Sequence, residues 1–148
     1  MIVTLCGSVR FEPDFHTASL ELAHRGIICF TLVVFPSRGS DVSERGAPLD
    51  TDYDKIILDL GYFYKIAKSD AVLVVGPGYI GKSTSREILW ATMVGKPVIH
   101  QLAHDWDSIV NRLRAGRTDV HLLQKAQMVL RGGDNTGHPA PFGYKHEE

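Results

Sequence analysis

The stretch from Ala71 to Val98 constrains the fold more than any other part of the chain. It begins with five apolar residues, Ala71 to Val75, that do not alternate with polar ones. Such a run is typical of a strand that is covered on both faces in a parallel sheet. A glycine-rich turn, an amphipathic helix from Ser83 to Val94 and a further apolar segment from Pro97 to Leu102 follow. This order predicts an α/β fold with a mostly parallel, doubly wound sheet of about five strands.

The rest of the chain fits the same architecture. Apolar segments at Ile2–Leu5 and Ile27–Phe35 predict two more strands, and apolar residues at helical spacing between Phe11 and Arg25 predict a helix that connects them. A length of 148 residues suits one domain. We therefore expect a single Rossmann-like or flavodoxin-like domain over residues 1–131, followed by an irregular Gly- and Pro-rich tail over residues 132–148.

The glycine-rich turn is a candidate anion site. Gly76, Gly78 and Gly81 permit backbone conformations and close approaches that side chains would block, and the following helix presents the positive end of its dipole. A phosphate group is therefore expected there. Glu87 falls at the start of the second turn of that helix, within reach of a molecule held by the turn. The spacing from Thr84 to Glu87 also matches a capping box, which would make Glu87 a structural residue instead.

The segment Gly76–Ser83 also matches the P-loop pattern G-x-x-x-x-G-K-S/T, with Lys82 as its lysine. This match predicts binding of ATP or GTP. A P-loop usually follows the first strand of its domain, however, and P-loop enzymes need an acidic residue that holds magnesium at the end of another strand. Here half of the chain precedes the motif, and none of the other apolar segments ends directly in Asp. The P-loop interpretation is kept as an alternative.

Three segments resemble the nucleoside 2-deoxyribosyltransferase superfamily, which includes nucleoside 5′-monophosphate N-glycosidases and small members with a YIG-x-ST-x-x-E block. They are CGSVR at residues 6–10, KIAKSDAVLVV at 65–75 and YIGKSTSREILWATMVGKPV at 79–98. The resemblance extends over roughly residues 1–102. It implies an enzyme, a hydrolase or a transferase, that acts on the N-glycosidic bond of a nucleoside, a deoxynucleoside or a 5′-monophosphate. Lys82 then occupies a variable position of the block.

The resemblance also implies roles for individual residues. Glu87 would be the catalytic nucleophile. A Gly-Ser turn followed by Arg10 offers backbone donors, a hydroxyl and a guanidinium, which together suit a phosphate. The residues expected to hold the phosphate or the 5′-hydroxyl end of the sugar are Cys6, Gly7, Ser8, Arg10, Gly78, Gly81 and Ser83.

The sequence departs from the family pattern in two places. Family members carry a carboxylate about two turns before the Ser-Asp pair that starts the next strand, and here Tyr62 stands nearest to that position, with Asp59 one turn earlier. Either residue is a candidate for orienting the base or protonating it. Thr4 stands where relatives have a Tyr that orients the nucleophile. Because the carboxylate on the base side is missing, a non-catalytic nucleotide sensor is a further alternative. The polar segment Pro36–Leu49 is long enough for a loop that closes over a substrate.

Composition and charge limit the classes of partner that we expect for this chain. There are 16 Lys and Arg against 17 Asp and Glu, without a long run of either sign, so we expect a small-molecule ligand and neither a nucleic-acid polymer nor a membrane. The longest apolar segment, Ile27–Pro36, is too short to span a bilayer, and a cytoplasmic protein is expected. Cys6 and Cys29 are expected to be reduced thiols, and no metal or other cofactor is expected. A homo-oligomer, such as a dimer, is implied by the resemblance alone.

Overall fold

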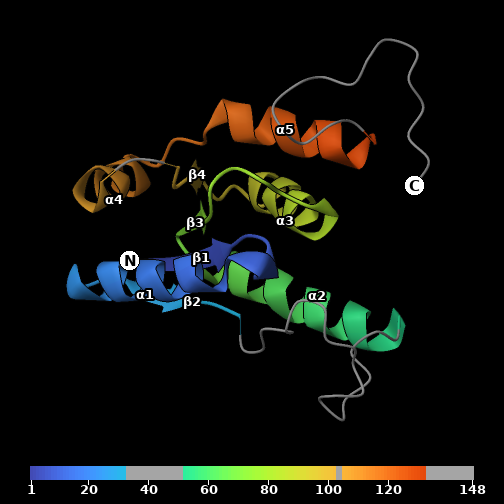
Figure 1. Ribbon diagram of the computed structural model, residues 1–148, viewed down its shortest axis with the longest axis horizontal. Helices are drawn as coiled ribbons and strands as arrows, with labels where there is room; N and C mark the ends of the chain where they lie inside the picture. Colours follow the sequence, from blue (N-terminus) through green and yellow to red (C-terminus); the bar gives the residue numbers. More distant parts are fainter. Residues whose placement is uncertain (33–51, 103–104, 133–148) are drawn as a thin grey trace.

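The computed structural model describes residues 1–32, 52–102 and 105–132. Strands and helices alternate along the chain as the sequence predicts, up to two consecutive helices at the end of the described part (Figure 1). In chain order they are β1 (Ile2–Cys6), the 3-10 turn η1 (Val9–Phe11), α1 (Glu12–His24), β2 (Ile28–Phe30), α2 (Asp52–Lys68), β3 (Ala71–Val74), α3 (Lys82–Met93), β4 (Val98–His100), α4 (Trp106–Ala115) and α5 (Val120–Leu130).

The described strands form one parallel sheet in the order β2-β1-β3-β4. Cys6 of β1 lies opposite Val74 of β3, and Val74 lies opposite His100 of β4. The carboxyl ends of these three strands are therefore level at one edge of the sheet. The parallel, doubly wound fold is confirmed, with four strands in the described part of the chain rather than about five. Because β1 has β2 on one side and β3 on the other, the topological switch point lies between β1 and β3.

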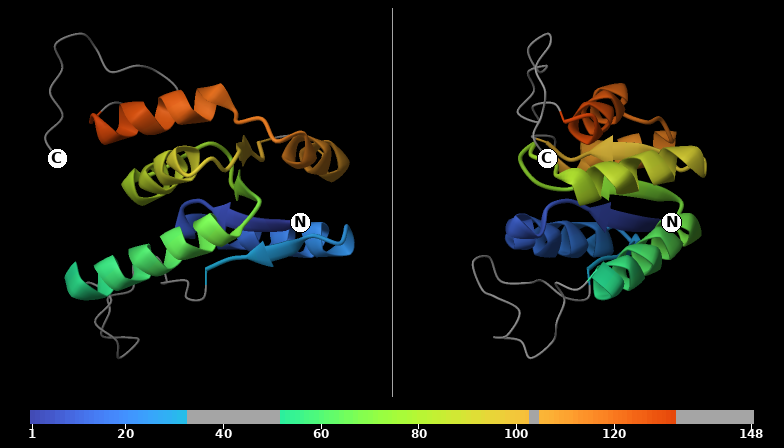
Figure 2. Two further views of the ribbon diagram at one scale, coloured as in Figure 1. Left: turned by 180° about the vertical axis from the view of Figure 1, so that it is seen from behind. Right: turned by 90° about the vertical axis from the view of Figure 1, so that its right-hand side faces the viewer.

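Helices cover both faces of the sheet. On one face, α1 and α4 pack on alternate residues of β1 and β3, and on the other face α2, α3 and α5 pack on the remaining ones. The α3 helix lies between α2 and α5 (Figure 2). All four residues of β3 are buried, which explains why its sequence is apolar without alternation. The two cores contain, respectively, Val3, Leu5, Phe15, Leu22, Leu73, Ile109 and Leu113, and Cys6, Tyr62, Ile66, Val72, Val74, Ile88 and Leu122.

The start of α3 differs from the expectation. The helix begins at Lys82, and Gly81 occupies the N-cap position in extended conformation, without a side chain that caps the helix. Thr84 therefore lies inside the first turn, where its side chain is buried. The predicted capping box of Thr84 and Glu87 is wrong, because Thr84 is not the N-cap residue. Glu87 lies beyond the first turn, where it cannot reach back to the N-cap N–H.

Other boundaries also shift. The second strand was expected over Ile27–Phe35, and β2 spans Ile28–Phe30. Residues 33–51, which include the predicted loop Pro36–Leu49, lie outside the described part. The tail beyond residue 132 lies outside it as well. The segment Val120–Leu130 is a single helix. Within the described ranges, no helix combines the length and apolar character that crossing a membrane requires.

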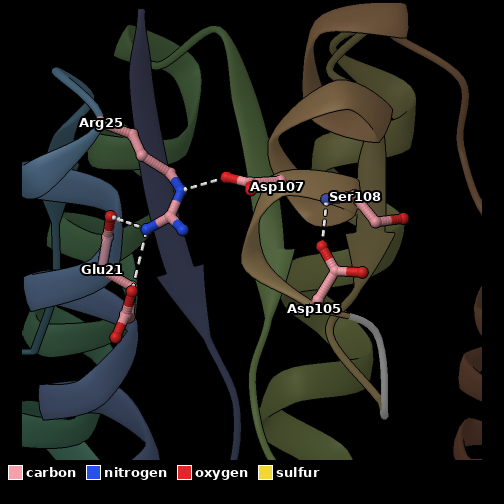
Figure 3. A network of polar contacts seen from close by, with 5 residues as sticks. All are labelled: Glu21, Arg25, Asp105, Asp107 and Ser108. Atoms are coloured by element: carbon pink, nitrogen blue, oxygen red, sulfur yellow. Dashed lines mark hydrogen bonds and ion pairs between the residues drawn. The ribbon is translucent and has the colours of Figure 1, made fainter.

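A small polar network joins the end of α1 to the start of α4 (Figure 3). Arg25 Nε donates to Asp107 Oδ1 at 2.9 Å, and its Nη1 donates to Glu21 Oε1 at 2.8 Å. Asp105 caps α4, because its Oδ1 accepts a hydrogen bond from the Ser108 N–H at 2.9 Å. These contacts fix the two helices that cover one face of the sheet, on the side away from Glu87.

The glycine-rich turn after β3 packs tightly against the turn after β1. Gly76 has a φ of +103°, and a Cβ atom at this position would lie 2.5 Å from Phe11 Cδ2. Only glycine therefore fits both the backbone conformation and the space. This contact holds the first residue of the turn against η1.

We expect Gly76→Ala to lower the free energy of unfolding by about 2 kcal/mol or more, since the backbone is strained and Phe11 must move. Urea denaturation followed by circular dichroism measures the change. The matched control is Gly61→Ala in α2, where a Cβ meets no atom within 4 Å, so that the helix gains roughly 0.5–1 kcal/mol. Equal stability of the Gly76→Ala variant and the wild type would contradict this account of the turn.

Candidate functional site

The candidate site lies where the carboxyl ends of β1 and β3 meet. The Val75 N–H donates to the Cys6 carbonyl at 2.8 Å, so pairing continues to the last residue of β1. The turn that starts at Gly7 and the turn that starts at Gly76 therefore leave the sheet side by side. Ligands of open α/β sheets bind at this kind of switch point. Two of the motifs noted in the sequence thus come together here.

Glu87 and Cys6 form the centre of this site. Glu87 lies in the second turn of α3 and is half-buried, whereas Cys6 is 1% exposed. Burial raises the pKa of the Cys6 thiol well above its usual value, and the charge of Glu87 and a hydrogen bond with its side chain raise it further. The thiol therefore stays protonated at neutral pH and donates to the Glu87 carboxylate. The side chain of Cys6 faces Glu87, although it was expected among the phosphate-binding residues.

Tyr62 of α2 lies beside the same carboxylate. Its side chain is 6% exposed, and its hydroxyl donates to the Leu5 carbonyl. Burial raises the pKa of Tyr62 well above its usual value, with smaller contributions from the nearby Cys6 and Glu87. The Tyr62 hydroxyl is thus neutral and already engaged with the end of β1. These contacts indicate that Tyr62 holds α2 against β1 next to Glu87.

Asp59 and Thr4 take different positions relative to this cluster. Asp59 precedes Tyr62 by three residues on α2, which places the two on the same side of the helix, and it is half-buried. The hydroxyl of Thr4 donates to the Lys65 carbonyl at 3.2 Å. Thr4 therefore anchors α2 to the sheet, whereas Asp59 is placed one turn along the helix from Tyr62.

The relative position of α2 and α3 is fixed by an aromatic pair. The rings of Phe63 and Trp90 lie 5.4 Å apart between centroids, and Trp90 Nε1 donates to the Phe63 carbonyl at 3.2 Å. Phe63 directly follows Tyr62, and Trp90 lies three residues after Glu87. The pair therefore sets the distance between Tyr62 and Glu87.

The turn after β1 holds Arg10 against the glycine-rich turn. The Ser8 hydroxyl accepts from the Arg10 N–H at 3.3 Å, which caps η1. The Arg10 guanidinium lies 4.0 Å from the centroid of the Tyr79 ring, a cation–π contact, and Phe11 meets the same ring edge-on with a centroid distance of 6.5 Å. Arg10 is thus positioned beside the turn that precedes α3. The sequence did not single out Tyr79 for this contact.

The remaining phosphate-binding candidates lie along the glycine-rich turn and the start of α3. Gly78 has a φ of +127°, and a Cβ there would meet no atom within 4 Å, so its backbone is accessible to a ligand. Gly81 is the N-cap of α3, and Ser83 lies exposed in the first turn. Lys125 of α5 also reaches this turn, since its Nζ donates to the Gly78 carbonyl at 2.6 Å. No local pattern in the sequence links Lys125 to a turn so far away.

The surroundings of β3 disfavour the P-loop alternative. Its neighbours β1 and β4 end in Cys6 and His100, which are followed by Gly7 and Gln101. Neither of these two strands therefore ends in a carboxylate that could hold magnesium beside a nucleoside triphosphate. In the parts of the chain that the structure describes, no group of three or more His, Cys, Asp and Glu side chains could hold a metal ion.

Comparisons with known proteins give one similarity. No family model matches the chain, and no curated protein does. Among solved structures, the chain is similar to the CMP N-glycosidase BcmB from Clostridium botulinum. The TM-score is 0.46 and the sequence identity 17%, over 79% of this chain and 83% of that one. At these values the likeness assigns no role to any residue of this chain.

The pKa of Cys6 has a consequence for stability. The pKa of a thiol in the unfolded chain is about 8.5, and that of Cys6 in the folded state is raised above it. Above about pH 8.5 the unfolded state therefore loses this proton while the folded state keeps it, so the free energy of unfolding falls as pH rises. Cys29, with a pKa raised to about 11, acts in the same direction. Between pH 8.5 and 10 each thiol contributes a loss of up to about 1.4 kcal/mol per pH unit.

We expect Cys6→Ser to remove about half of this pH dependence, because serine does not titrate in this range. Urea denaturation at several pH values between 8 and 10 measures the slope. Cys29→Ser is the matched control and should remove the other half of the pH dependence of stability. If the slope in the Cys6→Ser variant equals that of the wild type, Cys6 does not carry the raised pKa described above.

Proposed function

We propose that the protein cleaves or transfers the N-glycosidic bond of a nucleoside, a deoxynucleoside or a 5′-monophosphate, with Glu87 as nucleophile. The observation that carries this proposal is the position of Glu87. Its half-buried carboxylate lies beside the protonated Cys6 thiol, at the switch point, where the turn after β1 and the turn after β3 meet. The three sequence segments that resemble the nucleoside 2-deoxyribosyltransferase superfamily agree with it.

The chemistry follows from the position of the carboxylate. A Glu87 oxygen forms a bond with C1′ of the sugar while the bond between C1′ and the base nitrogen breaks. The bonding electron pair leaves with the base, which takes up a proton. Water then attacks C1′, restores the Glu87 carboxylate and releases a proton that balances the one taken up. In a transferase a second base replaces the water.

The groups around Glu87 divide into two kinds. Arg10, Ser8 and the N–H groups at the start of α3 would bind the 5′-phosphate or 5′-hydroxyl, so that binding energy remote from C1′ aligns the sugar. Cys6 and Tyr62 would be positioning residues, since both hydrogen-bond within the protein. Asp59 is then the better candidate for donating a proton to the base, because it lies on the same side of α2 and its carboxyl is only half-buried.

Self-association is part of the proposal, and an apolar stripe on α2 supports it. Ile56, Leu60 and Tyr64 recur at helical spacing, and each is more than half exposed. Ile57 lies next to them around the helix and is also half exposed. An apolar surface of this kind on a single helix is typical of a protein–protein contact, and a second copy of the chain is the occupant we propose.

Base release tests the catalytic proposal. The full chain, incubated without metal with a panel of nucleosides and 5′-monophosphates, is expected to release free base, measured by chromatography. Glu87→Gln should lower the rate at least about 1,000-fold, because it removes the nucleophile. Glu12→Gln, at an exposed carboxylate of α1, is the matched control and should keep the full rate.

A second set of variants separates the alternatives. Arg10→Gln should raise KM for 5′-monophosphates roughly 10–100-fold and change KM for free nucleosides little, because only the former carry the phosphate. Magnesium-dependent ATP turnover that is lost in Lys82→Ala, without base release, would instead support the P-loop alternative. Binding of nucleotides without any turnover would support the sensor.

Replacing one residue of the stripe tests self-association. Leu60→Glu should shift the protein from dimer to monomer in light scattering coupled to size exclusion, since a charge in an apolar contact is costly. Leu20→Glu, at an exposed position of α1, is the matched control and should leave the mass unchanged. A wild-type protein that is monomeric at high concentration would overturn this part of the proposal.

A further inference from the structure

A cavity lies beside the glycine-rich turn, between this turn, the end of β4 and α5. Its volume is about 430 Å³, which is large enough for a small organic ligand. The carboxyl end of β4 and one side of α5 form its walls together with the turn. The lining residues are Pro77, Gly78, Tyr79, His100, Leu102, His121, Leu122 and Lys125.

The lining of this cavity combines basic groups with apolar surface. Lys125, His100 and His121 contribute an ammonium and two imidazoles, and among the described lining residues there is no Asp or Glu. The carboxylate nearest along the chain, Asp119, accepts hydrogen bonds from the Arg112 guanidinium and from the backbone N–H of His100, the latter at 2.8 Å. Its charge is therefore balanced by Arg112, and the cavity keeps a basic character.

The Lys125 ammonium is directed to the cavity wall that the turn provides. Its Nζ donates to the Gly78 carbonyl at 2.6 Å, which places the ammonium at this wall. The His100 side chain, 8% exposed, comes from the last residue of β4, and His121 lies exposed on the first turn of α5. Three basic groups from two elements, β4 and α5, thus line one space beside the Tyr79 ring.

The lining of this cavity includes none of Glu87, Cys6 and Tyr62. Those residues lie where α3 faces α2 and β1, whereas the cavity is lined by the end of β4, by α5 and by the glycine-rich turn. The two places share this turn, in which Gly78 is also a candidate for holding a phosphate beside Glu87. Arg10 stacks on the Tyr79 ring, which itself lines the cavity.

We propose that this cavity binds a small organic phosphate monoester, in addition to the molecule that binds beside Glu87. A phosphate monoester carries up to two negative charges and several acceptor oxygens, which match the Lys125 ammonium and the two imidazoles. The apolar part of the ligand packs on Leu102, Leu122 and the Tyr79 ring. This site goes beyond the proposed function, because no residue at its lining takes part in bond cleavage.

Titration of the full chain with phenyl phosphate tests the site directly. Protein labelled at histidine would be followed by NMR through the imidazole signals of His100 and His121. We expect saturable shifts of both signals, with inorganic phosphate binding more weakly because it lacks the apolar group. Benzoate, which carries the apolar ring but a single charge, should bind at least about tenfold more weakly than phenyl phosphate.

Variants on either side of the turn locate the binding. His121→Ala and Lys125→Gln should each weaken binding of phenyl phosphate about tenfold or more, the size expected for one charge-assisted hydrogen bond. His121 is exposed, so its replacement should not disturb folding. Arg86→Gln, at an exposed cation of α3 outside the cavity lining, is the matched control and should change the affinity less than about twofold.

Three results would overturn the proposal. They are imidazole signals that do not move, equal binding of benzoate and phenyl phosphate, and a Lys125→Gln variant that binds phenyl phosphate as tightly as the wild type. The readout is binding rather than base release, so a protein without glycosidase activity could still bind phosphate here. Conversely, an active enzyme could fail this test.

Discussion

The pairing of β1 with β3 is the contact on which the candidate site depends. Strands that are far apart in the sequence become neighbours, and the hydrogen bond from the Val75 N–H to the Cys6 carbonyl carries the pairing to the edge of the sheet. A Cβ at Gly7 would lie 3.0 Å from the Val75 carbonyl oxygen, so the two turns can approach only because one begins with glycine. The first turn leads to α1 on one face of the sheet and the second to α3 on the other, which leaves a crevice between them.

The glycine-rich turn before α3 contacts two different parts of the fold. Toward β1 it meets Phe11 and Arg10, and toward α5 it meets Lys125. A P-loop pattern describes the same residues by their order alone, without regard to these neighbours. The roles of the turn depend on contacts from helices that lie before and after it in the chain.

The sequence predicted the elements whose pattern is local. The buried run of β3, the helix after it and the parallel character of the sheet follow from apolar spacing, whereas the order of the strands, which brings Gly7 and Gly76 together, comes from the structure. What it missed depends on tertiary contacts. The start of α3 at Lys82 follows from the extended backbone of Gly81, and the partner of the Tyr62 hydroxyl is a carbonyl of another strand. No spacing rule indicates either one.

The α2 helix carries Tyr62 on its buried side and the stripe of Ile56, Leu60 and Tyr64 on its exposed side. A partner that presses on the stripe therefore also restrains the helix that contacts the end of β1. Helix α2 is held to α3 through Phe63 and Trp90, so this restraint extends to the segment that carries Glu87. If the protein forms dimers and cleaves its substrate as proposed, turnover per molecule would rise with protein concentration until all of the protein is dimeric, and dilution would lower it.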